Sequence, residues 1–111
     1  MTEASAAKPN YTVKAIETIA TGTDVLARLY TLAPGDVIPW HFHNHVNDWY
    51  FCLAGQLSVE TRAPRDHQVL APGGRYEIPA KTAHRISNAG AEDCRFLLLQ
   101  GVGQYDFVKV G

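Results

Sequence analysis

Apolar and polar residues alternate along most of this sequence, and this period of two is the feature that most limits the fold. For example, Leu57, Val59 and Thr61 fall on one face of an extended chain, whereas Ser58 and Glu60 fall on the other. Successive side chains of a strand point to opposite faces of the sheet, so the pattern predicts a strand with one buried face.

The alternating segments are separated by residues that favour tight turns. The segments Ala33-Pro34-Gly35-Asp36 and Ala71-Pro72-Gly73-Gly74 supply the proline, glycine and aspartate that chain reversals need. No segment has the 3.6-residue period of a helix. We therefore expect an all-β barrel or sandwich, with strands over residues 11–19, 24–32, 37–43, 48–54, 56–62, 68–70, 75–79, 84–88, 95–100 and 104–110.

The length of 111 residues suits one domain with one core. Residues 1–10 are small and polar, which predicts a flexible N-terminal arm. Residues 11–111 are expected to form the single barrel domain.

The charge balance argues against a nucleic-acid or membrane partner. The sequence has 10 Lys and Arg against 11 Asp and Glu, a net charge of −1, which gives no basic surface for phosphates. It also has neither an apolar run of the roughly 18 residues that a membrane span needs nor the pattern of a secretory signal. We therefore expect a cytoplasmic protein with a small-molecule partner, and reduced thiols at Cys52 and Cys94.

Histidines are concentrated in one segment of the chain. His41 and His43 flank Phe42 in a predicted strand, so their imidazoles lie on one face about 7 Å apart, close enough to bind one ion. His45 follows two residues later, and His84 begins another predicted strand. Buried core histidines and a surface turn are the alternative interpretation, but three histidines within five residues favour a metal site.

Two spaced motifs carry a family resemblance. The first, G-x5-H-x-H-x4-E-x6-G, is matched by glycines and histidines, with aspartate in place of glutamate. The second, G-x5-P-x-G-x2-H-x3-N, is matched with lysine in place of its middle glycine. The positions are Gly35, His41, His43, Asp48 and Gly55, then Gly73, Pro79, Lys81, His84 and Asn88. The sequence thus resembles the cupin family. The lysine implies that the turn at Lys81 does not need a positive φ.

The resemblance implies a double-stranded β-helix, or jelly-roll, cupin barrel with one divalent transition metal inside it. Its ligands would be His41, His43, Asp48 and His84, a set of imidazoles and a carboxylate that suits Fe, Mn, Ni, Co or Zn. Asp48 is one methylene shorter than glutamate, so it either binds the ion directly or acts through a water.

Two further residues are candidates for a catalytic role. His45 shares the parity of the first two histidines, so it either substitutes as a ligand or faces substrate from a loop at the barrel mouth. Tyr50 points inward if Asp48 does, which makes its hydroxyl a candidate contact for a ligand or for the substrate. Arg28 is equally compatible with the surface and with an anchor for an anionic ligand, and Gln100 is similarly ambiguous.

These features predict a metal-dependent enzyme, an oxygenase, isomerase or lyase, that acts on a small organic molecule. The alternative is a non-catalytic cupin that binds or senses a small molecule with the metal as its anchor; a metal-free barrel with a polar pocket is a third possibility. The segments 95–99 and 105–110 hold more apolar residues than one core face can use, which predicts a homodimer.

Overall fold

The structure is a computed structural model that describes residues 11–111; the predicted arm, residues 1–10, lies outside the described residues. The described chain forms ten strands and no helix, which confirms the all-β expectation. A helix able to cross a membrane is therefore lacking in this part of the chain. The strands are β1 (Ala15–Thr21), β2 (Val25–Leu32), β3 (Val37–Phe42), β4 (Asn47–Ala54), β5 (Leu57–Arg62), β6 (Arg65–Leu70), β7 (Arg75–Ile78), β8 (His84–Asn88), β9 (Cys94–Gly101) and β10 (Val108–Lys109).

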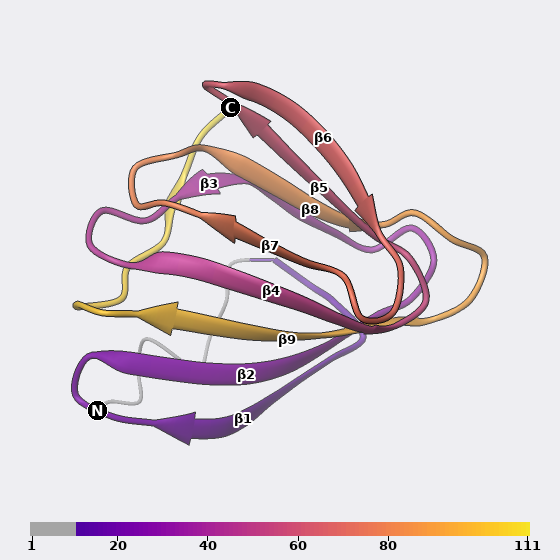
Figure 1. The fold of residues 1–111 in the computed structure, drawn as a ribbon, viewed down its shortest axis with the longest axis horizontal. Coiled ribbons are helices and arrows are strands. Elements are labelled where there is room, and N and C mark those ends of the chain that lie inside the picture. The colour runs from indigo at the N-terminus through magenta and orange to yellow at the C-terminus, as the bar shows by residue number, and fades with distance from the viewer. Residues whose placement is uncertain (1–10) are drawn as a thin grey trace.

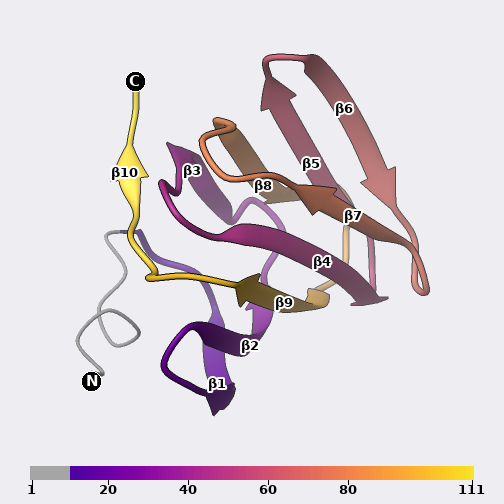
Figure 2. The same ribbon diagram turned by 60° about the vertical axis from the view of Figure 1, so that its left-hand side comes forward.

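The strands form two antiparallel five-stranded sheets that face each other (Figure 1). One sheet has the order β1-β2-β9-β4-β7, and the other has the order β10-β3-β8-β5-β6. Figure 2 shows the two sheets as opposite walls, with the short β10 beside β3 near the end of the chain. This arrangement is the predicted double-stranded β-helix.

The inner faces of the two sheets enclose an apolar core at one end of the barrel and a polar cluster further along. In β2 the inward residues are Leu26, Arg28, Tyr30 and Leu32, all buried. The ring of Tyr30 stacks on that of Phe96 with centroids 4.9 Å apart. The inward-facing side chains of β9 and β4 are mostly apolar, but each strand also points one polar residue inward. These residues are Gln100 in β9 and Asp48 in β4, and they are cross-strand neighbours.

Strand boundaries differ from the prediction mainly at the two ends of the chain. The first strand begins at Ala15 instead of residue 11, and the last predicted strand, 104–110, is reduced to β10. Before β10, Tyr105 and Phe107 of that segment pack their rings against the histidines of the barrel. Strand β6 begins at residue 65, three residues before the predicted start.

A bulge in β3 brings the first histidine into the barrel. Ile38 and His41 are both buried although they are three residues apart, which a regular strand does not allow. The register with β8 shifts between these two residues, and one extra residue in β3 restores the inward direction. Pro39 lies inside the bulge, where its missing N–H is tolerated.

The prediction for the turn at Lys81 is wrong, because Lys81 adopts a φ of 68°. Its backbone N–H donates a hydrogen bond of 2.7 Å to the carbonyl oxygen of His43. This bond joins the turn before β8 to the end of β3, so the left-handed conformation is kept even with a side chain that disfavours it. A non-glycine residue in this conformation costs about 1 kcal/mol.

Candidate metal centre

Four buried side chains converge between the two sheets. His41 and His43 come from β3 and the residue after it, His84 begins β8, and Asp48 lies on β4 of the opposite sheet. Each is at most 3% exposed. One potential ligand atom from each residue lies within 4.8 Å of all the others. The structure thus brings together the four residues that the sequence singled out as metal ligands.

Each of the three imidazoles is oriented by a backbone carbonyl. The Nδ1 atoms of His41, His43 and His84 lie 2.7, 2.6 and 2.8 Å from the carbonyl oxygens of Pro39, Asp106 and Thr82, respectively. A carbonyl oxygen can only accept, so Nδ1 carries the proton and donates it. Each Nε2 atom then keeps its lone pair, which is the form of histidine that binds a metal.

The lone pairs of two of these Nε2 atoms face the carboxylate of Asp48. Its Oδ2 lies 3.0 Å from Nε2 of His84 and 3.3 Å from Nε2 of His43. Nε2 of His84 is nevertheless buried without a hydrogen-bond partner. Such acceptors repel each other unless a metal ion or a proton lies between them. Two ligands bound about 2.1 Å from one ion at angles of 90° to 110° are about 3.0 to 3.4 Å apart, so the spacing fits a bound metal.

Burial and mutual contacts control the charges of the cluster. Burial, followed by the neighbouring His84 and His43, lowers the pKa of His41 from 6.5 to about 2. Burial alone would raise the pKa of the Asp48 carboxyl, but the imidazoles of His43 and His84 lower it. Burial also opposes protonation of His43, yet Asp48 outweighs it and raises the pKa of that imidazole. The cluster therefore contains an ionised carboxylate, and its negative charge favours the binding of a cation.

Two neutral side chains hold the carboxylate of Asp48 in place. The hydroxyl of Tyr50 donates to Oδ2 over 2.8 Å, and the amide of Gln100 donates to Oδ1 over 2.9 Å. The oxygen of Gln100 in turn accepts a hydrogen bond of 2.8 Å from Nη2 of Arg28. Despite its short side chain, Asp48 thus lies within reach of the histidines, and the expected inward direction of Tyr50 agrees with the structure.

The sequence alone leaves the roles of Gln100 and Arg28 open. Both are 2% exposed and lie inside the barrel. The sequence pattern places Gln100 inside the barrel, because it has the same parity as Phe96 and Leu98, which are buried residues of β9. Arg28 has the same relation to Tyr30 on β2, but a charged residue on a buried face contradicts the usual pattern.

Aromatic residues after β9 cover one side of the histidines. The ring of Phe107 stacks on His41 with centroids 4.1 Å apart, and the ring of Tyr105 lies 5.4 Å from that of His43. His45, in contrast, is exposed in the loop between β3 and β4. It does not belong to the group of four potential ligands.

Fold and site together define an all-β barrel protein with a buried centre of three histidines and one aspartate that could bind a metal. The model of the family described as "Cupin domain" matches residues 28–100. This chain belongs to the cupin family, as the two motifs indicated. No curated protein matches the sequence.

Solved structures with the same fold include three from bacteria. TT1209 from Thermus thermophilus is 26% identical over 86% of this chain and 90% of its own, with a TM-score of 0.75. An uncharacterised conserved protein with a double-stranded beta-helix domain from Klebsiella pneumoniae is 19% identical over 94% of this chain and 90% of its own, with a TM-score of 0.76. Oxalate decarboxylase from Bacillus subtilis is 20% identical over 78% of this chain but only 24% of its own, with a TM-score of 0.70.

Proposed function

We propose that this protein binds one divalent transition metal through His41, His43, Asp48 and His84. The observation that carries the proposal is the buried Nε2 atom of His84, which lies 3.0 Å from a carboxylate oxygen without a hydrogen bond. Three neutral nitrogen ligands and one carboxylate suit Fe, Mn, Ni, Co or Zn. The carbonyls that fix the Nδ1 protons supply the outer support that metal-binding histidines usually have.

We further propose that the protein is a metal-dependent enzyme, an oxygenase, isomerase or lyase, that acts on a small organic molecule. Four protein ligands leave coordination positions for substrate on an ion that prefers five or six. The bound metal would supply Lewis-acid or redox chemistry. Oxalate decarboxylase from Bacillus subtilis, one of the solved structures that share this fold, is an enzyme.

The roles of the two predicted catalytic residues differ. Burial, then the charge of Asp48, raises the pKa of the Tyr50 hydroxyl well above its usual value. Tyr50 therefore keeps its proton and positions Asp48 by donating to it. His45 is exposed next to the metal-bearing segment, so its proposed role is to contact substrate from the loop.

Metal analysis tests the metal site. Protein purified without a nickel column is analysed by inductively coupled plasma mass spectrometry, with His43→Ala as the test variant and His67→Ala as the control. His67 is an exposed histidine of β6 that bonds to Ser58, away from the cluster. We expect about one metal per wild-type and control chain and a loss in His43→Ala. Equal metal in all three, or none even after reconstitution, would contradict the proposal.

The alternative function is binding or sensing of a small molecule with the metal as its anchor. It differs from catalysis in one observable: the bound molecule is recovered unchanged. Incubation of the metal-loaded protein with candidate organic acids, under air and under argon, followed by mass spectrometry of the small molecules, separates the two functions. Turnover that is lost in His43→Ala supports the enzyme, whereas saturable binding without turnover supports the sensor.

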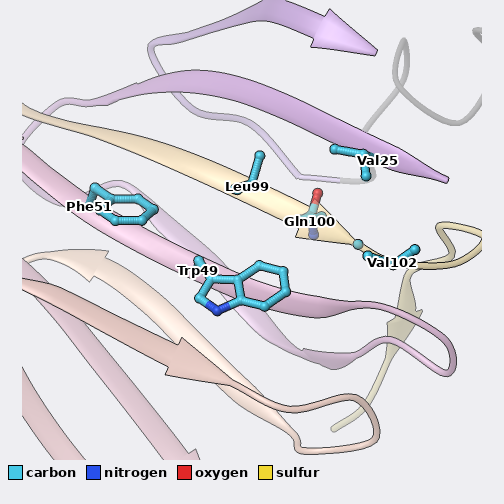
Figure 3. Close-up of a pocket in the computed structure, with 7 residues that line it drawn as sticks. Val25, Trp49, Phe51, Leu99, Gln100 and Val102 are labelled. Carbon is cyan, nitrogen blue, oxygen red and sulfur yellow. The ribbon is translucent and has the colours of Figure 1, made fainter. Parts of the chain in front are cut away.

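We propose a homodimer formed through the outer face of the sheet that contains β2, β9 and β4. Trp49 is the cross-strand neighbour of Leu99, and Phe51 that of Leu97, so their outward side chains form adjoining apolar rows. Figure 3 shows Trp49, Phe51 and Leu99 on this face. These three residues line a pocket of about 270 Å³. The neighbouring Val102 is 69% exposed. A continuous apolar face of this kind is costly to leave in water.

Light scattering tests the homodimer at micromolar concentration. We expect twice the chain mass of 12.2 kDa for the wild type and the single-chain mass for Leu99→Glu, which introduces a charge into the apolar face. A single-chain mass for the wild type would reject the dimer. The cytoplasmic location stays a prediction from the sequence.

A further inference from the structure

Arg28 is a buried cation close to the metal centre. It lies on the inner face of β2 and is 2% exposed. Its Nη2 atom donates to the side-chain oxygen of Gln100, but its Nε atom is buried without a partner. Among the described residues, no carboxylate forms an ion pair with Arg28. The guanidinium therefore has a hydrogen-bond donor that the folded chain leaves unused, and its charge is met only by aromatic rings and a neutral amide.

Such an arrangement is costly unless something else compensates for it. Moving an ion out of water costs several kcal/mol, even after the protein relaxes around it. A buried polar atom without a partner costs about a further 1–3 kcal/mol. The neighbouring positions of the same face are Leu26 and Tyr30, so packing alone would accept an apolar side chain here. A buried arginine with an unused donor would be stabilised by a partner that binds at this position.

The surroundings of Arg28 suit an anion. The guanidinium carbon lies 5.4 Å from the ring centre of Tyr30 and 5.1 Å from that of Tyr105. The hydroxyls of Tyr11 and Tyr30 are 3.3 Å apart. Phenol hydroxyls donate hydrogen bonds, and the planar guanidinium offers parallel N–H groups that match the two oxygens of a carboxylate.

The surroundings of Arg28 adjoin the candidate metal centre. Gln100 accepts a hydrogen bond from Arg28 and donates one of 2.9 Å to Asp48. Tyr105 lies against Arg28 and also against the ring of His43. The carboxylate of Asp48 faces His43 and His84 and is linked to the guanidinium only through Gln100, so the positive charge of Arg28 has no carboxylate partner among the described residues. A ligand with its own negative charge would balance it.

We propose that Arg28 binds the carboxylate of a small organic acid whose other end lies toward the metal, so that Arg28 determines specificity for acids. This inference rests on the proposed function and names its substrate class. Tyr105 lies on a segment without strand pairing between β9 and β10. Its ring contacts the guanidinium, so the proposed carboxylate would bind beside it.

Isothermal titration calorimetry tests the inference on the metal-loaded full chain. The probes are glycolate, pyruvate and succinate, with glycolamide as the neutral counterpart of glycolate and inorganic phosphate as a second anion. We expect at least one acid to bind, and glycolamide to bind more weakly than glycolate. Replacing Arg28 by Met should weaken binding of the acid about 10- to 100-fold, the loss expected for a hydrogen bond to a charged group. Arg28→Lys keeps the positive charge but lacks the parallel N–H groups of the guanidinium, so it should weaken binding less than Arg28→Met.

Arg85→Met is the matched control, since Arg85 is an arginine of β8 that pairs with Glu60 and is only partly buried. It should change neither metal content nor affinity for the acid. Metal content and far-ultraviolet circular dichroism are measured on every sample, so that loss of metal, which contradicts the proposed function, is distinguished from loss of acid binding at full metal content. The inference is wrong if metal-loaded wild type binds none of the acids. It is also wrong if phosphate or glycolamide binds more tightly than the acids, or if the folded Arg28 variants bind acids as well as wild type.

Discussion

Removing the hydroxyl of Tyr50 should destabilise the protein and weaken metal binding more than removing that of Tyr30, although both side chains are 1% exposed. Tyr50 donates 2.8 Å to the ionised carboxylate of Asp48, whereas Tyr30 makes one contact of 3.3 Å with the hydroxyl of Tyr11. A hydrogen bond to a charged group contributes about 1.5–3 kcal/mol, against about 0.5–1.5 kcal/mol for a neutral one. Tyr50→Phe should therefore destabilise the protein by roughly 1 kcal/mol more than Tyr30→Phe.

The two variants also differ in their distance from the metal. Because Tyr50 positions a proposed ligand, its removal should weaken metal affinity about 10- to 100-fold, the range for groups that support a ligand. Urea unfolding of metal-free protein gives the stability, and competition with a chromophoric chelator gives the metal affinity. Tyr30→Phe should leave the metal affinity unchanged. Equal destabilisation by the two variants, together with an unchanged metal affinity in Tyr50→Phe, would refute this reasoning.

Three further predictions concern residues outside the metal centre. Burial, and then the charge of Cys52, raises the pKa of the Cys94 thiol to about 12. The native protein at pH 8 should therefore not react with Ellman's reagent until urea unfolds it, and rapid reaction of the native thiol would contradict this. Lys81→Gly should raise the unfolding free energy by about 0.5–1 kcal/mol, since glycine accepts a positive φ without strain; a loss in chemical denaturation would contradict it. Gly55→Ala should lower stability by more than about 1 kcal/mol, because φ is +77° and the added Cβ would lie 2.6 Å from the carbonyl oxygen of Asp93; an unchanged melting temperature would contradict it.

Much of the fold follows from the sequence because alternation and burial agree along the strands. Leu57, Val59 and Thr61 are all buried, as the period of two predicts, but Ser58, which the pattern places on the outer face, is also buried at 6% exposure and bonds to His67. Alternation fails in β3, where a bulge lets Ile38 and His41 share the interior. No residue pattern predicts a bulge of this kind, although a proline inside a predicted strand is compatible with one.

The candidate metal centre was predictable partly from the local spacing of two histidines and partly from the family resemblance. His41 and His43 are two residues apart, and the family resemblance supplied Asp48 and His84. The groups that surround these residues depend on the pairing of distant strands. Gln100 reaches Asp48 because β9 pairs with β4, with these two residues in register.

The turn at Lys81 illustrates a limit of residue preferences. Lysine disfavours a positive φ, so the sequence predicted an ordinary turn. The hydrogen bond from its N–H to His43 holds the chain in the left-handed region instead. A tertiary contact here outweighs a local preference of about 1 kcal/mol.

The measurement that tests the central claim most directly is anomalous X-ray diffraction from crystals of metal-loaded protein, recorded on both sides of the absorption edge of the bound metal. The account predicts one anomalous peak inside the barrel, about 2.0–2.2 Å from the Nε2 atoms of the three histidines and from an oxygen of Asp48. Density that shows Nδ1 as the coordinating atom, or a metal located only on the surface of fully loaded protein, would contradict it.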